Sequence, residues 1–127
     1  MDIRLKRAFE TPARSDGPRI LVDRIWPRGV AKKDADIVHW LKGLAPSTEL
    51  RKWFGHDPDK WPEFREHYLK ELQSDEASED LAALRSLLGD HDRITLVFAA
   101  KDTDHNNAVA LRDFILAGRL GPLGRKK

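Results

Sequence analysis

The 127-residue sequence contains no cysteine, no long apolar run and no glycine-rich loop. The lack of cysteine excludes disulfides, thiolate metal sites and cysteine nucleophiles. No stretch approaches the ~20 apolar residues that a membrane-spanning helix needs, and residues 1–7 lack the apolar core of a secretory signal. No segment has the glycine spacing of a loop that cradles phosphate groups. We therefore expect a cytoplasmic protein that does not contact membranes.

The residues that are present are typical of one globular domain. Charged side chains make up 35% and apolar side chains 40% of the chain, which suits a solvated surface around a core. A length of 127 residues lies within the range of about 100–150 that is commonest for single domains. We expect residues 1–127 to form one domain with a short basic tail at residues 119–127, and the sequence leaves the oligomeric state open.

The net charge of +2 is unevenly distributed along the chain. Residues 1–33 carry nine Lys or Arg against four Asp or Glu, and residues 93–127 carry seven against three. Residues 59–92 reverse this balance, with four against ten. If both ends of the chain contribute strands to one edge of a sheet, their cations meet in one crevice and attract anions. The alternative is a mixed, solvated surface without such a focus.

Three segments have the pattern of strands in a sheet, and a fourth is ambiguous. Residues 3–9 alternate apolar and cationic side chains, as in a half-exposed strand. Residues 19–23 and 94–100 contain apolar runs, as in strands buried on both faces of a parallel sheet. Residues 37–45 fit either a short strand or a helix, and we favour a strand because Gly43 weakens a helix.

Apolar residues at helical spacing indicate four helices. They cover residues 47–54, 61–72, 78–88 and 107–117, the last one after the N-cap residue Asn106. Between the second and third strands we expect a polar connection. The order of elements predicts an α/β fold, with a small, mostly parallel sheet of three or four strands flanked by helices in a Rossmann-like layered arrangement. Ligands in such folds bind beyond the carboxyl ends of the strands.

Charged residues follow two of the predicted strands. Asp23 and Arg24 lie at the end of the second strand, and Arg28 lies in the loop that follows. Lys101 and Asp102 lie at the end of the last strand. If these strands are parallel, all five side chains meet at one edge of the sheet. Two guanidinium groups and one ammonium group suit a phosphate or a carboxylate, and one of the two carboxylates would act as a general base or order a water molecule.

Three further residues near this edge are candidate ligand-binding residues. Trp26 lies between the two arginines of the loop. His105 and Asn106 lie at the start of the last helix, whose N-terminus adds free backbone N–H groups and the positive end of the helix dipole. A structural interpretation stays open, in which Trp26 belongs to the core and Asp23 pairs with a cation of the same edge, because buried charges are costly unless they are paired.

The segment before the last helix also raises the question of a metal ion. Asp102, Asp104 and His105 have side chains of the types that bind metals. Asp and Asn residues ahead of a helix are equally ordinary capping residues. We expect no metal site, and the sequence indicates no cofactor.

Three motifs occur together in this chain. They are Asp-Arg-x-Trp-Pro-Arg-Gly at residues 23–29, Ala-Pro-Ser at residues 45–47 and Ala-Lys-Asp-x-x-His-Asn at residues 100–106. With this combination the chain resembles, over almost its whole length, the YeaO-like branch of the domain of unknown function (DUF) family 488. The motif residues of that family correspond here to Asp23, Arg24, Trp26, Arg28, Ser47, Trp53, Lys101, Asp102, His105 and Asn106.

What the resemblance implies is a small prokaryotic α/β protein of the cytoplasm whose biochemical activity is not established. Wider relatives carry cysteines after the final strand, where this chain has Ala99 and Asn106. The resemblance therefore implies no thiol chemistry.

Our leading hypothesis from the sequence is that the chain binds an anionic small molecule, phosphate-bearing and of the nucleotide class, in a cationic crevice. Arg24, Arg28 and Lys101 hold the anion, and an aspartate handles protons if the protein is a hydrolase or transferase. Whether it is an enzyme is left open. The alternatives are a module that associates with nucleic acid through the basic ends and Trp26, which the residues favour less, and a non-catalytic protein-interaction domain.

Overall fold

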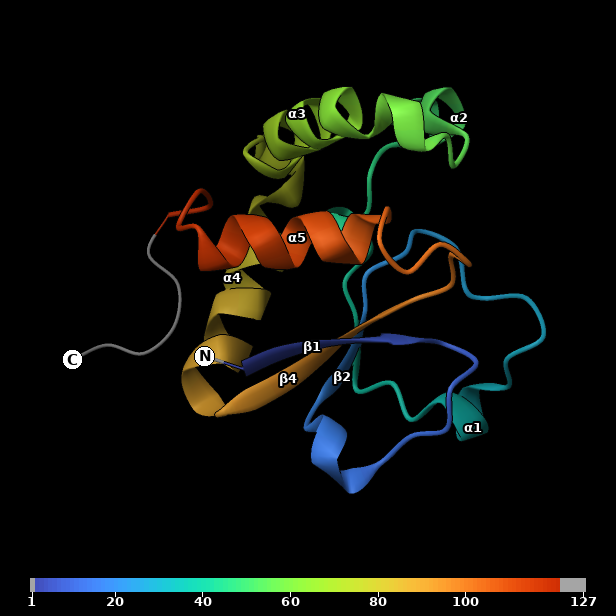
Figure 1. The fold of residues 1–127 in the computed structure, drawn as a ribbon. Coiled ribbons are helices and arrows are strands. Elements are labelled where there is room, and N and C mark those ends of the chain that lie inside the picture. Colours follow the sequence, from blue (N-terminus) through green and yellow to red (C-terminus); the bar gives the residue numbers. More distant parts are fainter. Residues whose placement is uncertain (1, 122–127) are drawn as a thin grey trace.

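A sheet of four parallel strands forms the centre of the computed structural model, in which residues 2–121 are described (Figure 1). The strands are β1 (Asp2–Arg7), β2 (Arg19–Leu21), β3 (His39–Trp40) and β4 (Arg93–Phe98). Their order across the sheet is β1-β4-β2-β3, so the strand that comes last in the chain lies between the first two. The predicted α/β fold with a small parallel sheet is confirmed.

The ambiguous segment, residues 37–45, contains a strand of only two residues, β3. The chain then turns through a 3-10 helix at Lys42–Leu44. Here the backbone N–H of Gly43 donates a hydrogen bond to Asp80 Oδ2, which lies 2.6 Å away. A Cβ atom at position 43 would collide with that carboxylate, so the glycine is what permits the close approach. The strand prediction is therefore correct only for the central residues of the segment.

The described part of the chain has five α-helices, which are α1 (Lys32–Ala35), α2 (Thr48–Phe54), α3 (Trp61–Leu72), α4 (Asp75–Asp90) and α5 (Asn107–Leu116). α3 has the predicted bounds. α4 begins at Asp75, three residues before the predicted start at Ser78. Ser78 lies inside the helix, where its hydroxyl donates a hydrogen bond to the carbonyl oxygen of Asp75 and does not cap the helix. α1 is a single turn within the segment that was predicted to be a polar connection.

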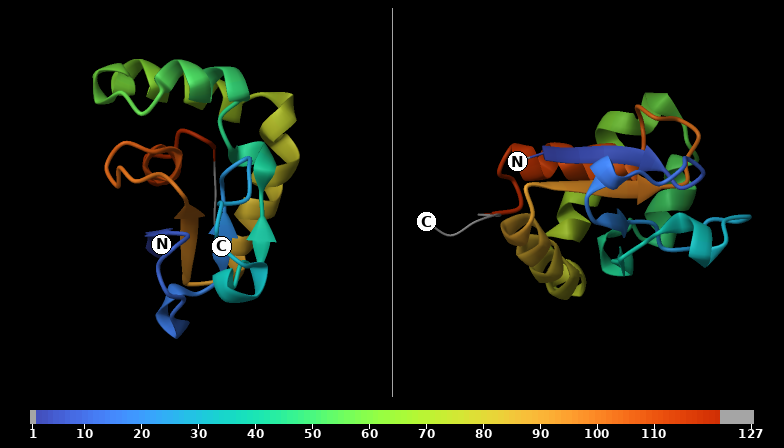
Figure 2. Two further views of the ribbon diagram at one scale, coloured as in Figure 1. Left: turned by 90° about the vertical axis from the view of Figure 1, so that its right-hand side faces the viewer. Right: turned by 90° about the horizontal axis from the view of Figure 1, so that it is seen from below.

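The longer helices lie on one face of the sheet. In the left-hand view of Figure 2 the green helices α2 and α3 lie above the strand arrows, and the buried side chains of α3, α4 and α5 belong to the same core cluster. The side chains of the strands on this face join the main core, and they are Ile3, Ile20, Val22, Ile94, Leu96 and Phe98. The opposite face has a smaller core around Leu21 and Val97, against which Trp26 and Trp40 pack.

Buried charges stabilise the second face at the start of β2. Arg19 is 1% exposed, and it donates hydrogen bonds to the carbonyl oxygen of Ala35 at 2.9 Å and to Asp16 Oδ2 at 2.8 Å. Lys6 Nζ and the backbone N–H of Ala13 also donate to the carboxylate of Asp16. Burial alone would raise the pKa of Asp16, but these hydrogen bonds lower it overall. The network anchors the strand that leads into the candidate site.

The topology brings the two predicted site segments to one edge of the sheet. β2 and β4 are parallel neighbours, so the loops that follow them, residues 22–30 and 99–106, leave from the same edge. α2, which follows the edge strand β3, lies above these loops in the ribbon (Figure 1).

Two expectations concern the ends and the exterior of the chain. Of the segment predicted to be a basic tail, Leu120 is 4% exposed, and residues 122–127 lie outside the described residues. Between residues 2 and 121 no helix combines the length and the apolar character that crossing a membrane requires.

Candidate functional site

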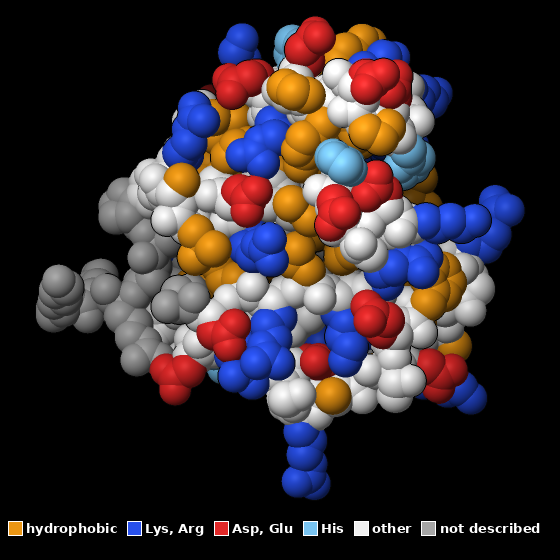
Figure 3. Space-filling view, in the orientation of Figure 1, with side chains coloured by type: hydrophobic (Ala, Val, Ile, Leu, Met, Phe, Trp, Pro, Cys, Tyr) orange, Lys and Arg blue, Asp and Glu red, His pale blue; other side chains and the backbone are white. Residues whose placement is uncertain are grey.

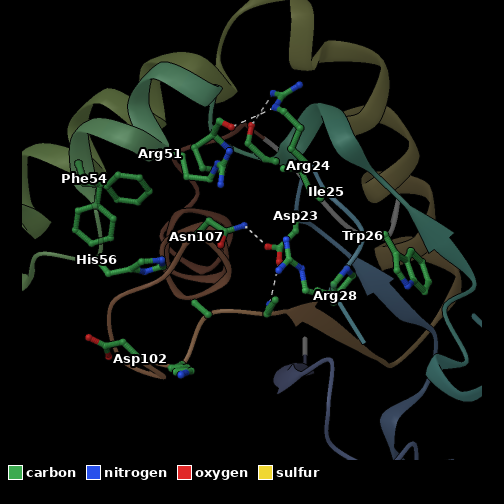
Figure 4. Close-up of a pocket in the computed structure, with 17 residues that line it drawn as sticks. Asp23, Arg24, Ile25, Trp26, Arg28, Arg51, Phe54, His56, Asp102 and Asn107 are labelled. Carbon is green, nitrogen blue, oxygen red and sulfur yellow. Dashed lines mark hydrogen bonds between the residues drawn. The ribbon is translucent and has the colours of Figure 1, made fainter. Parts of the chain in front are cut away.

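A cavity of about 670 Å³ opens beyond the carboxyl ends of β2 and β4 (Figure 4). Its lining comes mainly from three segments, which are residues 23–28 after β2, residues 99–102 after β4 and residues 45–56 after β3. Phe64 of α3 and Asn107 of α5 complete the lining. The two segments that the sequence assigned to one edge of the sheet therefore share one cavity.

Four cationic side chains line this cavity. Three of them, Arg24, Arg28 and Lys101, were expected here from the sequence, and the fourth is Arg51 of α2. The guanidinium of Arg24 donates to the backbone carbonyl oxygens of residues 45 and 46, over 3.3 and 3.4 Å. The other three side chains are exposed and form no hydrogen bond or ion pair with another residue in the range 2–121. They are available to an anion.

Asp23 is held rigidly in the cavity wall. Its Oδ2 accepts a hydrogen bond from the backbone N–H of Ala99 at 2.9 Å, and its Oδ1 accepts one from Asn107 Nδ2 at 3.2 Å. Burial raises the pKa of Asp23, although these two hydrogen bonds and the charge of Arg51 act in the opposite direction. The ion pair with Arg28 or another loop cation, which the sequence left open, is not formed.

The two asparagines at the start of α5 have different surroundings. Asn106, predicted to orient a ligand, is 3% exposed and serves as the N-cap: its Oδ1 accepts from the backbone N–H of Val109 and its Nδ2 donates to the carbonyl oxygen of Asp102. Asn107 lines the cavity instead, and its Nδ2 donates to the carbonyl oxygen of Val22 at 2.8 Å as well as to Asp23. The amide that reaches the cavity is therefore one residue further along the chain.

Asp102 and His105 form a local cap rather than a cavity-spanning pair. Asp102 Oδ1 accepts from the backbone N–H groups of Asp104 and His105, and its Oδ2 lies 2.9 Å from His105 Nδ1. The hydrogen bond from Asp104, followed by that from the His105 ring, lowers the pKa of Asp102. Asp102 lines the cavity, whereas the ring of His105 stands edge-on to Trp61. Residues 2–121 contain no group of three or more His, Asp or Glu side chains placed to hold a metal ion.

Trp26 lines the cavity but is also fixed from behind. Its Nε1 donates to the carbonyl oxygen of Val30 at 2.7 Å, and its ring meets the ring of Trp40 edge-on at 5.4 Å. Trp40 Nε1 in turn donates to the carbonyl oxygen of Asp23 at 2.7 Å. Both tryptophans thus hold the loop that carries Asp23 and the arginines.

Aromatic side chains form the wall on the other side. Phe54 and Phe64 stack with their ring centroids 4.4 Å apart, and His56 lies 6.3 Å from Phe54. Figure 4 shows Phe54 and His56 on the opposite side of Asp23 and Asn107 from Trp26 and Arg28. The backbone of His56 has a φ of 60°, a left-handed conformation that few residues other than glycine adopt. The two sides of the cavity therefore differ in chemistry.

Three polar lining residues, Arg51, His56 and Asn107, were not among the predicted site residues. A usable signal existed for Arg51, because α2 begins soon after β3 ends, at the edge of the sheet where ligands bind. For His56 the sequence showed only a turn ahead of a proline. For Asn107 the sequence correctly assigned the helix cap to its neighbour Asn106, but it gave no sign that Asn107 rather than Asn106 would face the cavity.

A family model described as the "Inactive DUF488-N3 subclade" matches residues 2–120, and so includes every segment of the cavity. The chain belongs to this subclade of DUF488. Among its relatives, the uncharacterized protein YeaO of Escherichia coli (strain K12) is 41% identical over 116 residues, which cover 91% of this chain and 97% of YeaO.

A second relative, an uncharacterized protein of Mycobacterium tuberculosis (strain ATCC 25618 / H37Rv), is 40% identical over 117 residues. The match covers 92% of this chain and 95% of the relative. No solved structure matches the chain.

Proposed function

We propose that the cavity binds an anionic small molecule with a phosphate group and a flat apolar part, as in a nucleotide. The observation that carries this proposal is the gathering of four cationic side chains around one cavity, three of them without any hydrogen bond or ion pair to another residue of the described chain. Like charges repel one another, so such a group is favourable where an anion joins it.

The balance of charge in the cavity supports an anionic occupant. Against the four cations stand only two carboxylates, Asp23 and Asp102, and each of them already accepts hydrogen bonds from the chain. On the face shown in Figure 3, by contrast, Lys and Arg side chains lie among Asp and Glu side chains. Guanidinium and ammonium groups donate well to phosphate oxygens.

The size and the apolar wall of the cavity support the second half of the proposal. A volume of about 670 Å³ lies within the range of sites for small molecules and cofactors, which is about 300–1,000 Å³. Phe54, Phe64 and Pro46 supply buried apolar surface, and a nucleobase stacks on such surface. A simple inorganic anion would leave this wall uncovered.

Binding without turnover is the form of the proposal that the family supports, because the subclade is described as inactive. Within the cavity, both oxygens of Asp23 accept hydrogen bonds from the chain, so this carboxylate is positioned as a fixed acceptor. The alternative is a hydrolase or transferase in which Asp23 or Asp102 moves the proton. Analysis of the incubated nucleotides for reaction products distinguishes this alternative from binding alone.

The test is calorimetric titration of the protein with ATP, ADP, AMP and inorganic phosphate, repeated with the guanine, cytosine and uracil nucleotides. Replacement of Arg28 or Lys101 by Ala should weaken nucleotide binding about tenfold or more, since a hydrogen bond to a charged group contributes about 1.5–3 kcal/mol. Lys52→Ala is the matched control, because Lys52 is exposed on the same helix as Arg51 and does not line the cavity.

A bound nucleotide at 100 times its dissociation constant should also stabilise the protein by about 2.7 kcal/mol, which thermal unfolding detects. Chromatography of the incubated nucleotides should show no product. Absence of binding by every phosphate compound, or an equal loss in Lys52→Ala, would refute the proposal.

A further inference from the structure

Asp23 and Asn107 form a pair of hydrogen-bond acceptors in the cavity wall, between Phe54 on one side and Arg28 on the other (Figure 4). We infer that this pair binds the adjacent hydroxyl groups of a ribose, so that the cavity distinguishes ribonucleotides from nucleotides that lack those hydroxyls. The inference rests on the proposed function and assigns the part of the nucleotide that lies between base and phosphate.

The orientation of the Asn107 amide follows from its partners. Its Nδ2 lies 2.8 Å from the carbonyl oxygen of Val22 and 3.2 Å from Asp23 Oδ1. Both partners are acceptors, so the NH₂ group must face them and both of its hydrogens are used. The amide oxygen therefore remains as an acceptor, and it has no hydrogen-bond partner in the described part of the chain.

Asp23 keeps acceptor capacity as well. Each of its oxygens receives one hydrogen bond, from Ala99 or from Asn107, while a carboxylate oxygen can accept two. Because Asn107 Nδ2 is bonded to Asp23 Oδ1, the free amide oxygen of Asn107 lies close to the carboxylate. Two neighbouring acceptors suit two donors on neighbouring atoms, and the hydroxyls on C2′ and C3′ of ribose are such donors.

A phosphate group does not fit this position, because its oxygens are acceptors and negative charges repel a carboxylate. The cations offer the phosphate a better place, and the aromatic wall at Phe54 and His56 offers one to the base. Figure 4 shows Asp23 and Asn107 between Phe54 on one side and Arg28 on the other, whereas Arg51 lies on the side of Phe54. From Phe54 to Arg28, the order of aromatic ring, acceptor pair and cation therefore matches the order of base, sugar and phosphate in a nucleotide.

The experiment compares ATP, dATP and 2′,3′-dideoxy-ATP by calorimetric titration of the wild-type chain, with the guanine, cytosine and uracil or thymine series alongside. The three probes of a series share the triphosphate and differ only in sugar hydroxyls, apart from the methyl group of thymine. Binding should weaken about tenfold to a hundredfold from the ribonucleotide to the dideoxynucleotide, as expected for the loss of hydrogen bonds to a charged acceptor.

Variants locate the effect. Asp23→Ala and Asn107→Ala should bring the ribose and dideoxy affinities to within about threefold of each other, because each removes one acceptor of the pair. Arg28→Ala should weaken all three probes by the same factor and leave their ratio unchanged. If a variant unfolds, the side-chain amide signal of Asn107 in ¹⁵N NMR replaces it, and this signal should shift with ATP and not with dideoxy-ATP.

The outcomes separate the two proposals. Equal binding of the three probes overturns the ribose inference and leaves the proposed function standing. A preference that persists in both Asp23→Ala and Asn107→Ala, or an Asn107 signal that responds equally to both probes, also overturns the inference. If no nucleotide and no phosphate binds, the proposed function fails, and the inference fails with it.

Discussion

Asp16 offers a sharp test of how the second face of the sheet is stabilised. Asp16 is 4% exposed, and its carboxylate is the only acidic group that pairs with Arg19 among the residues described. In Asp16→Asn the side chain keeps its shape and loses its charge. The buried guanidinium of Arg19 then has no counter-charge, and one of its nitrogens, Nη2, already lacks a hydrogen-bond partner in the described chain.

The expected loss of stability is large. Removal of one partner from a buried ion pair typically costs about 3–5 kcal/mol, because the remaining charge stays buried. The total stability of a domain is about 5–15 kcal/mol, so the variant should lose a substantial part of it. With a urea m-value of about 2 kcal/mol per M, the unfolding midpoint should fall by about 1.5–2.5 M.

Urea unfolding followed by tryptophan fluorescence measures this shift. Glu66→Gln is the matched control, since Glu66 is exposed on α3 and the same loss of charge there should change stability by less than about 0.5 kcal/mol. Adding Arg19→Met to Asp16→Asn removes the orphaned charge and should restore part of the lost stability. A midpoint for Asp16→Asn equal to that of Glu66→Gln would refute the reasoning, as would a double variant less stable than Asp16→Asn.

Two further predictions concern acid and the site loop. The pKa of Asp16 is lowered from its ordinary value of 3.8 in the folded chain. Its contribution to the free energy of unfolding is therefore fully present above pH 3.8 and is lost as the pH falls below that value. If unfolding is measured from neutral pH downward, the wild type and Asp16→Asn should converge in stability in this acid range. Trp26→Phe removes the hydrogen bond to Val30 and should lower the free energy of unfolding in urea by about 1 kcal/mol. Trp53→Phe is the control, because no indole hydrogen bond forms at Trp53 within residues 2–121, and it should lower stability by less than about 0.5 kcal/mol. Equal losses in the two variants would contradict the role of Trp26 in fixing the loop.

The sequence predicted the sheet edge well, for a physical reason. Residues 20–22 and 96–100 are apolar at successive positions, and such strands are stable only when both faces of a parallel sheet are covered. In the structure they are neighbours, so the charged residues that follow each strand share one cavity. The predicted strands nevertheless end two residues late, because Asp23 and Ala99 leave the ladder to bond to one another.

What the sequence did not reveal depends on contacts between distant residues. Gly43 and Asp80 are 37 positions apart, and their hydrogen bond holds the 3-10 helix that follows β3. The choice between Asn106 and Asn107 is similar: either can cap a helix, and a shift of one residue turns a side chain by about 100° around the helix axis. Only the position of Asp23 beneath the start of α5 makes Asn107 the residue of the cavity.

The frame of the cavity and its cations are stabilised in different ways. The loops are tied together by polar groups that satisfy backbone atoms: Arg7 donates to the carbonyl oxygens of Ala99 and Ala100, and Arg24 does the same for residues 45 and 46. These bonds fix the frame whether or not the cavity is occupied. Arg28, Arg51 and Lys101 line the cavity without a hydrogen bond or ion pair in the described chain, although the charge of Arg51 favours the ionised form of Asp23. An anion can join these cations while the frame stays in place, which is the arrangement expected of a preformed binding site.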